Sequence, residues 1–211
     1  CDDDNDSQFG NPCDAATGNK YESDTDVSIA GIKLTRSYNS QNPQDSGFGK
    51  GWSSNVQRRL SVAGSSILSY RSDGKSEPWV KAGSNWSSDG DETLMLSEDA
   101  NGFTLTRANG TNEYYSLTGQ LVSITDTNGL ATQYHYGTND KVTSIIGPWG
   151  HTLSLTYNHD DLINTATDSL GYTWVYGYDT NRNLVSVTYP DFDPQDLSNN
   201  PIKTYHYENI N

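Results

Sequence analysis

Hydrophobic residues recur at a fixed interval of 21 positions in the second half of this 211-residue chain. Two aliphatic columns, one glycine column and one tyrosine column keep this register. They are Leu121, Val142, Ile163 and Leu184; Ile124, Ile145, Ala166 and Val187; Gly129, Gly150 and Gly171; and Tyr136, Tyr157 and Tyr178. A fixed period is typical of units that cannot bury an apolar face alone and therefore stack on copies of themselves. The repeat predicts an extended all-β scaffold rather than a compact catalytic domain.

Each repeat contains an apolar strand, a turn and an aromatic strand. In the first copy these are residues 121–124, 126–129 and 132–136. Alternation within the aromatic strand places its large side chains on one face of a sheet. We expect two antiparallel strands per unit, joined to their neighbours in one continuous twisted sheet. The last copy opens at Leu184, but its aromatic strand at 204–207 arrives eight residues late, which predicts a surface loop near 191–200.

Residues 21–118 are not repetitive, but they alternate like strands and are divided by turn dipeptides. Asp73-Gly74, Asn101-Gly102 and Asn109-Gly110 are examples. Such dipeptides accept the positive φ of the tight turns that join antiparallel strands, so this region predicts an antiparallel meander. No stretch shows a helical stripe. We divide the chain into an acidic lead-in at 1–20, the meander at 21–118 and the repeats at 119–211.

The repeat unit resembles the YD repeat of bacterial Rhs (rearrangement hot spot) proteins and animal teneurins. The fullest copy contains Gly119-Gln-Leu121, Asp126-Thr-Asn-Gly129 and Tyr134-His-Tyr136-Gly. A second copy contains Asp168-Ser-Leu-Gly171 and Tyr176-Gly-Tyr178-Asp179, whereas Gly147 replaces the turn aspartate in the copy between them. The region upstream is similar to the one that precedes Rhs repeats, in the motifs that include Asp24-Thr-Asp26, Leu34-Thr-Arg-Ser-Tyr-Asn-Ser40 and Phe48-Gly-Lys-Gly-Trp52.

This resemblance implies a β-sheet ribbon that, in full-length members, spirals into a hollow shell. Bacterial shells of this kind often enclose a C-terminal toxin, and teneurin shells belong to adhesion proteins. About four repeats are too few to enclose a cargo, and the chain shows no C-terminal effector. The resemblance therefore implies a scaffold here, and a toxin-enclosing shell only in a longer chain.

The net charge of −14 argues against a nucleic-acid partner, because such partners bind clustered Lys and Arg. It favours a solubilised secreted or cell-surface protein. No segment approaches the roughly 20 apolar residues of a membrane span, and we expect no transmembrane segment.

The N-terminal segment carries two further candidates. Cys1 and Cys13 predict a disulfide in an oxidising compartment, with two free thiols as the alternative. The alternating carboxylates of Asp2, Asp4 and Asp6, followed by Asp14, suit a hard cation such as calcium. This run is similar to the acidic calcium repeats of thrombospondin type 3, except that Ser7 stands where glycine is usual. The alternative is a solvated acidic linker.

The sequence offers no catalytic arrangement, and we expect no enzymatic activity. His135 and His206 occupy equivalent positions of the repeat, and no Ser/His/Asp set has the context of a nucleophile. Aromatic side chains provide another candidate chemistry. Trp86 and Trp149 each lie beside a turn and are candidates for stacking on sugar rings if they are exposed.

Three functions follow from these features. The first is a structural β-sheet module of an Rhs/YD-type protein, whose partner is the rest of a longer chain. The second is an adhesin segment that binds glycans or a receptor. The third is a self-assembling subunit of an extracellular filament that pairs with other copies of itself through unpaired strand edges.

Overall fold

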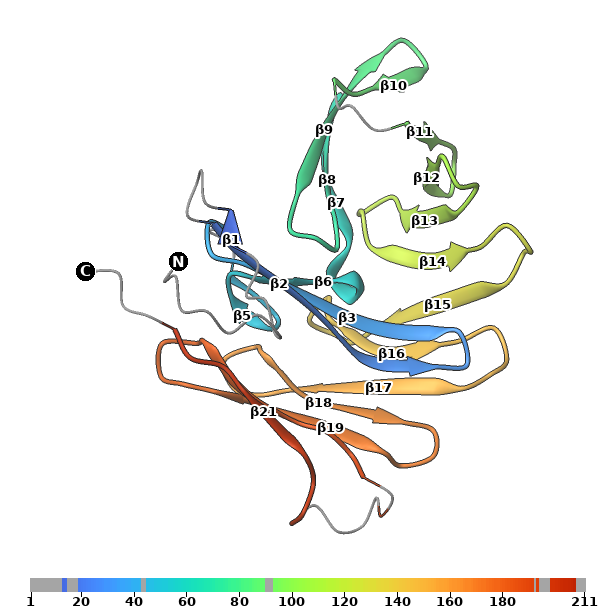
Figure 1. Ribbon diagram of the computed structural model, residues 1–211. Coiled ribbons are helices and arrows are strands. Elements are labelled where there is room, and N and C mark those ends of the chain that lie inside the picture. Colours follow the sequence, from blue (N-terminus) through green and yellow to red (C-terminus); the bar gives the residue numbers. More distant parts are fainter. Residues whose placement is uncertain are drawn as a thin grey trace.

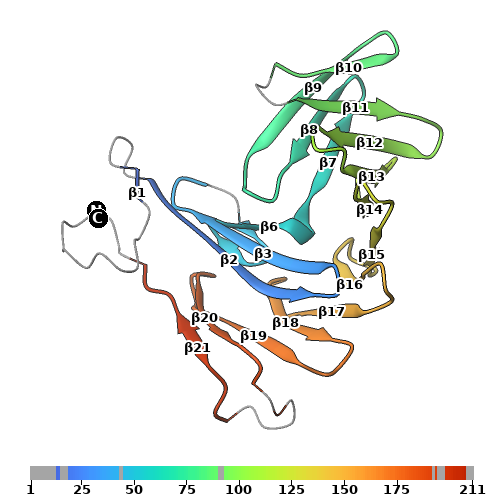
Figure 2. The same ribbon diagram turned by 45° about the vertical axis from the view of Figure 1, so that its right-hand side comes forward.

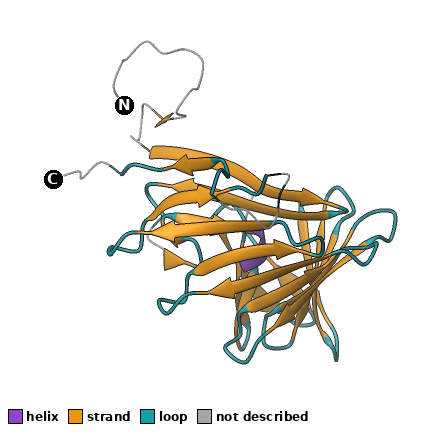
Figure 3. Ribbon diagram, turned by 90° about the horizontal axis from the view of Figure 1, so that it is seen from below, coloured by secondary structure: helices purple, strands orange, loops and turns teal. Residues whose placement is uncertain are grey.

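A computed structural model describes residues 13–14, 19–42, 45–89, 93–191, 193 and 198–207 of the chain. Strands dominate these residues, and the one helical element among them is the short 3₁₀ helix η1, Asn55–Gln57. Figure 3 shows this helix among the strands. Neighbouring strands pair antiparallel throughout the described sheets. The predicted all-β class is confirmed.

The largest element is an open sheet of 11 strands, which lie in the order of the sequence. It is curved, and its strands turn from β11 at one end to β21 at the other (Figure 1). The strands are β11 (Leu94–Glu98), β12 (Gly102–Arg107), β13 (Asn112–Ser116), β14 (Leu121–Thr125), β15 (Ala131–Tyr136), β16 (Val142–Ile146), β17 (Thr152–Tyr157), β18 (Ile163–Asp168), β19 (Thr173–Tyr178), β20 (Leu184–Thr188) and β21 (Ile202–Thr204). The predicted boundary at 118/119 falls between two paired strands of this sheet.

Three smaller sheets precede it. One has the order β1-β2-β3-β6, a second the order β10-β9-β8-β7, and a third joins β4 to β5. Their strands are β1 (Cys13–Asp14), β2 (Asn19–Ile29), β3 (Ile32–Asn39), β4 (Asp45–Ser46), β5 (Gly49–Lys50), β6 (Trp52–Ser54), β7 (Arg59–Ala63), β8 (Ser66–Tyr70), β9 (Ser76–Ala82) and β10 (Asn85–Ser87).

The repeat columns form one buried layer of the large sheet. All four residues of the first aliphatic column are buried, and Ile145, Ala166 and Val187 of the second column are buried with them. Alternation then sorts the aromatic strand as predicted, because Tyr134 is buried and His135 is exposed. Successive two-strand units therefore share a single hydrophobic core, which the sequence predicted.

The tyrosine column joins the two strands of each unit. Tyr136, Tyr157 and Tyr178 each donate a hydroxyl hydrogen bond to the backbone carbonyl 15 residues earlier, those of Leu121, Val142 and Ile163, at 2.8–3.0 Å. Tyr207 makes the same bond to the carbonyl of Leu184 at 2.8 Å, across the longer last unit. Phenylalanine would fill the same space without this bond, so the pattern explains why the column is tyrosine.

One β-bulge per unit falls at this tyrosine. The register shifts at Tyr114/Tyr115, His135/Tyr136, Thr156/Tyr157 and Gly177/Tyr178. A bulge bends its strand and increases the local right-handed twist. Four bulges in one register therefore contribute to the curvature of the sheet. Tyr115 shares the bulge, so the structural repeat begins before residue 119.

The turns of the repeat are closed by side-chain oxygens. Asp126 Oδ1 accepts hydrogen bonds from the amides of Asn128 and Leu130, and Asp168 Oδ1 accepts them from Leu170 and Tyr172. Each turn then passes through a glycine with φ near +80° or +90°, a conformation that glycine adopts without a steric cost.

The hairpin formed by β2 and β3 lies in the bend of the large sheet (Figures 1 and 2). The turn of this hairpin reaches the turn between β16 and β17. A Cβ atom built on Gly147 would lie 2.7 Å from the carbonyl oxygen of Ala30 and 2.9 Å from Cγ1 of Ile32. This contact explains why the repeat lacks its turn aspartate at Gly147.

Candidate functional site: the junction between the N-terminal hairpin and the repeat sheet

A cluster of charged and hydroxyl side chains joins the β2–β3 hairpin to the far end of the large sheet. Arg36 lies on the inward face of β3 with Ile32 and Leu34, four and two residues away, and its side chain is 0% exposed. Its main partner, Asp26, occupies the bulge of β2 between Thr25 and Val27. The bulge turns the Asp26 side chain inward, where it is also 0% exposed.

The guanidinium of Arg36 forms a two-point ion pair with this carboxylate. Nε donates to Asp26 Oδ2 at 2.5 Å and Nη2 donates to Asp26 Oδ1 at 2.8 Å. The same Nη2 lies 2.9 Å from the hydroxyl of Tyr205 and 3.4 Å from Asp24 Oδ2. The guanidinium carbon lies 4.6 Å from the ring centroid of Trp52, so one face of the cation rests on an aromatic ring.

The repeat sheet contributes hydroxyl donors to both aspartates. Tyr176 and Tyr189 donate to the two oxygens of Asp26, each at 3.0 Å. Tyr205 donates to Asp24 Oδ2 at 2.6 Å. These bonds join residues at least 150 positions apart in the sequence. The junction therefore holds the first hairpin against the last described repeat.

Lys203 on β21 extends the cluster toward the open end of the sheet. Its ammonium donates to Asp24 at 2.7 Å and 2.9 Å and to Glu22 at 2.7 Å. Three acidic side chains of β2 therefore contact the large sheet. Glu22 and Asp24 bond to Lys203 of β21, and Asp26 bonds to Tyr176 of β19. Each carboxylate is occupied by donors, so the cluster is built to hold segments together.

The electrostatics of the cluster fix the charge states of its members. Burial would lower the pKa of Arg36, but the hydrogen bond and charge of Asp26 outweigh it and raise that pKa above its usual value. Burial likewise opposes ionisation of Asp24, yet bonds from Lys203 and Tyr205 hold its pKa below the usual range. Burial and the charge of Asp26 raise the pKa of Tyr176 far above its usual value. The Arg36 cation, the Asp24 carboxylate and the neutral Tyr176 phenol therefore persist at neutral pH.

A second polar junction ties the β7 sheet to the large sheet. Glu113 is 1% exposed and accepts hydrogen bonds from Arg58 Nη1 and Arg107 Nε, both at 2.8 Å, and from the hydroxyl of Tyr115 at 2.5 Å. The amide of Leu60 donates to the carbonyl of Gly119 at 2.8 Å nearby. Glu113 stands 21 residues before Tyr134, so an ion pair replaces an aromatic residue of the repeat.

Sequence reasoning missed Arg36 and Asp26 as a pair. A signal was present, because Arg36 follows Ile32 and Leu34 at the spacing that places residues on one face of a strand. A cation on an apolar face requires a buried partner. The partner itself was hidden, since a bulge moves Asp26 to the same face and the sequence does not mark it.

The structure places the sequence-predicted site residues as follows. Trp86 is 8% exposed, packs edge-on against Phe103 and donates its ring N–H to Glu98 at 3.0 Å. Trp86 is therefore not exposed, as stacking on a sugar ring would require. Trp149 is 63% exposed and does meet this requirement. The two lie on separate sheets and do not form one surface row.

The predicted disulfide and calcium residues fall mostly outside the described part of the chain. Cys1, Asp2, Asp4 and Asp6 lie outside it, and Cys13 and Asp14 are described by their backbone alone, which pairs with Lys20 and Asn19. Within the described ranges, no group of three His, Cys, Asp or Glu side chains is placed to hold a metal ion. The same ranges contain no helix with the length and apolar character to cross a bilayer.

Two families match the sequence. The family described as Domain of unknown function (DUF6531) matches residues 10–79. The family described as RHS Repeat matches residues 115–152 and 153–191. The first match contains the hairpin with Arg36, and the second begins at the tyrosine where the first bulge occurs.

Curated relatives and one solved structure are also similar to this chain. Three relatives are each 28% identical over 134 residues, which cover 61% of this chain and 6% of the relative. They are the tRNA nuclease WapA of Bacillus subtilis strain 168, the tRNA3(Ser)-specific nuclease WapA of Bacillus spizizenii and the tRNA(Glu)-specific nuclease WapA of Bacillus subtilis subsp. natto. The solved structure of TcdB2-TccC3-Cdc42 aligns with 92% of this chain and 14% of that chain, at 16% identity and a TM-score of 0.34.

Proposed function

Because this chain belongs to the Rhs/YD-repeat proteins, we propose that it is the starting scaffold module of a longer secreted or cell-surface protein. In this function the N-terminal hairpin lies in the first bend of the repeat sheet and sets its curvature. The module carries out no catalysis of its own. The observation that carries this proposal is the buried Arg36–Asp26 junction between the hairpin and β19–β21.

The polar character of the junction supports a positioning role. A buried ion pair adds little net stability over an apolar packing of the same shape, but it tolerates one geometry only. Apolar side chains alone would let the hairpin slide over the aliphatic layer. The tyrosine donors on β19 and beyond β20 and β21 fix which strand meets which part of β2.

The relatives are consistent with a scaffold that carries its effector elsewhere. The three relatives share one identity value with this chain, although the names of two of them give different tRNA specificities. A segment that is equally similar to all three is a poor candidate for the part that selects the tRNA. The chain spans about 6% of their length, so any nuclease or other toxin would belong to a longer chain.

Hydrogen exchange of the backbone amides tests the proposed role of the junction. Arg36→Met leaves Asp26 buried without its cation, and we expect faster exchange in β2, β3 and β19–β21. The amides of β15–β17 should keep their protection, because their bonds lie within the repeat. Lys33→Met on the same strand is the matched control, since Lys33 is exposed.

Uniform loss of protection over the whole large sheet would contradict the proposal, because the junction would then stabilise without positioning. Unchanged exchange at β19–β21 would contradict it as well. In that case the curvature would come from the repeats alone.

A second candidate function is self-assembly through β21. This strand pairs with β20 along one edge, and no described strand is hydrogen-bonded in the sheet to its other edge. Ile202 on β21 is 62% exposed. Unpaired edges recruit other chains. Light scattering distinguishes the two functions, because the scaffold module alone has a mass of 23.2 kDa and an assembly exceeds it.

A further inference from the structure

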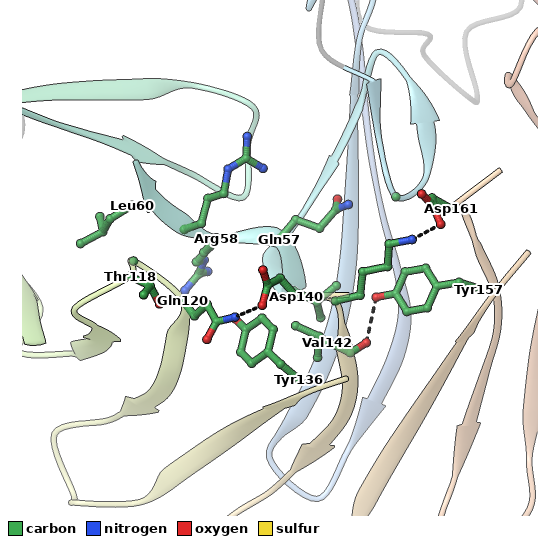
Figure 4. A pocket seen from close by; sticks show the side chains of 15 residues that line it. Gln57, Arg58, Leu60, Thr118, Gln120, Tyr136, Asp140, Val142, Tyr157 and Asp161 are labelled. Carbon is green, nitrogen blue, oxygen red and sulfur yellow. Dashed lines mark hydrogen bonds and ion pairs between the residues drawn. The ribbon is translucent and has the colours of Figure 1, made fainter. Parts of the chain in front are cut away.

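A cavity of about 610 Å³ lies between the N-terminal region and the large sheet. The segment from Val56 to Leu60 forms one wall, and residues of the β13–β14, β15–β16 and β17–β18 connections form the opposite wall (Figure 4). Sites for small molecules are typically about 300–1,000 Å³. The Arg36–Asp26 junction lies elsewhere, against β19–β21, whereas the second junction, through Arg58 and Gly119, borders this cavity.

Part of the lining is apolar. Val56, Leu60 and Val142 contribute aliphatic surface, and Tyr136 and Tyr157 contribute rings. Both tyrosine hydroxyls are directed at backbone carbonyls, and Figure 4 shows this bond for Tyr157. The rings therefore meet the cavity as carbon surface.

The rest of the lining is polar and balanced in charge. Arg58 pairs with the buried Glu113, and Lys141 pairs with Asp161. Arg59 stacks on the ring of Tyr70 at 4.1 Å, and Gln120 Nε2 donates to Asp140 Oδ1 at 2.9 Å. The lining carries three cations and two carboxylates, and Glu113, which lies outside the lining, pairs with Arg58. Because two of the cations are neutralised by their partners, a strongly charged ligand of either sign is disfavoured.

We propose that this cavity binds a neutral saccharide. A pyranose ring has a C–H face that packs on tyrosine rings and aliphatic side chains, and hydroxyl edges that donate and accept hydrogen bonds. Asp140 accepts from ligand hydroxyls through the oxygen that Gln120 leaves open, and Gln120 and Arg59 donate to them. The site shares no residue with Trp86 or Trp149.

Saturation-transfer NMR and calorimetry on the purified 211-residue chain test the proposal. The probes are neutral hexose, N-acetylhexosamine and pentose trisaccharides, with inorganic phosphate as a charged comparison. We expect saturable binding of at least one trisaccharide with a Kd on the order of 1 mM or tighter. We expect no binding of phosphate.

Two substitutions locate the bound sugar. Asp140→Asn removes a charged acceptor, and we expect about a tenfold weaker Kd. Asn suits this position, because residue 140 has φ of +55° and Asn tolerates that conformation better than most residues. Trp149→Ala removes an exposed aromatic ring outside the cavity and should leave the Kd unchanged.

Gln120→Ala is a second variant at the rim, in case Asp140→Asn melts at a lower temperature than the parent chain. It should weaken binding in the same direction. Absence of saturable binding across the trisaccharides would overturn the proposal, and so would binding that Asp140→Asn and Gln120→Ala leave unchanged or that phosphate displaces.

Discussion

The repeat sheet and the N-terminal hairpin are held in place by two different kinds of contact. In the repeat sheet, Tyr136, Tyr157 and Tyr178 each bond to a carbonyl 15 residues earlier, and the aliphatic columns pack on their own copies. The hairpin instead depends on contacts with residues more than 110 positions away, and some of these contacts span 150 residues or more. Local bonds recur in every unit and can be lost one at a time. The junction occurs once, and its members depend on one another.

This difference shows how a periodic sheet acquires a fixed shape. Copies of one unit specify a strand pairing and a twist, but not where the curve begins. The hairpin adds a unique feature to an otherwise repetitive surface. Two contacts fix its position. One is the ion pair of Arg36 with Asp26, and the other is at Gly147, where the absence of a side chain lets Ala30 and Ile32 approach the repeat.

The largest effect should come from the junction. Arg36→Met leaves the Asp26 carboxylate buried and unpaired, which typically costs about 3–5 kcal/mol of unfolding free energy. Urea denaturation followed by tryptophan fluorescence measures the loss. Lys33→Met, on the exposed face of the same strand, should stay within about 0.5 kcal/mol of the parent. A loss below about 1 kcal/mol for Arg36→Met would show that the hairpin is held by apolar packing alone.

Restoring the repeat pattern at position 147 should destabilise the protein. Gly147→Asp gives the turn its usual aspartate but forces a Cβ against Ala30 and Ile32, and crowding of this kind costs about 1–3 kcal/mol. Thermal melts compare it with Gly147→Ala, which adds the Cβ without the charge. Both variants should lose stability. A gain in either would mean that the hairpin turn does not determine this glycine.

A single bond of the repeat should matter less. Tyr157→Phe removes the hydroxyl that donates to the Val142 carbonyl, and we expect a loss of about 1 kcal/mol. Tyr114→Phe serves as the control, because Tyr114 is exposed on β13 and stands outside the column. Equal effects of the two substitutions in urea denaturation would contradict a role for the tyrosine column in joining the two strands of a unit.

The smallest effect is a dependence on pH. The pKa of Asp24 in the folded protein lies below its ordinary value of 3.8, so its carboxylate contributes stability above that pH and loses it as the pH falls through the folded pKa. Asp24→Asn should therefore be less stable than the parent at pH 6, and the gap should narrow below the ordinary aspartate pKa. Urea titrations at several pH values measure the gap, and a constant gap would contradict the expectation.

Much of the repeat region follows from the sequence, because a period is a local property. The columns of Leu121 and Tyr136 predicted which residues share one hydrophobic layer and how the strands alternate, and the resemblance to Rhs proteins is confirmed by the family matches. The sequence predicted the candidate site less well than the repeats. Trp86 and Trp149 were chosen for their places beside turns, but whether a turn residue faces the core or the solvent depends on what packs there.

The sequence by itself determined the class of the fold, the two-strand unit and which residues of each repeat strand share a face, since alternation and periodic turns act over a few residues. Only the tertiary structure decided that Asp26 turns inward at a bulge, that the Arg36–Asp26 pair finds its tyrosine partners far along the chain, and that Gly147 makes room for the hairpin. Those features depend on which distant segments meet. The local sequence around Asp26 and Gly147 does not indicate which distant segments these residues contact.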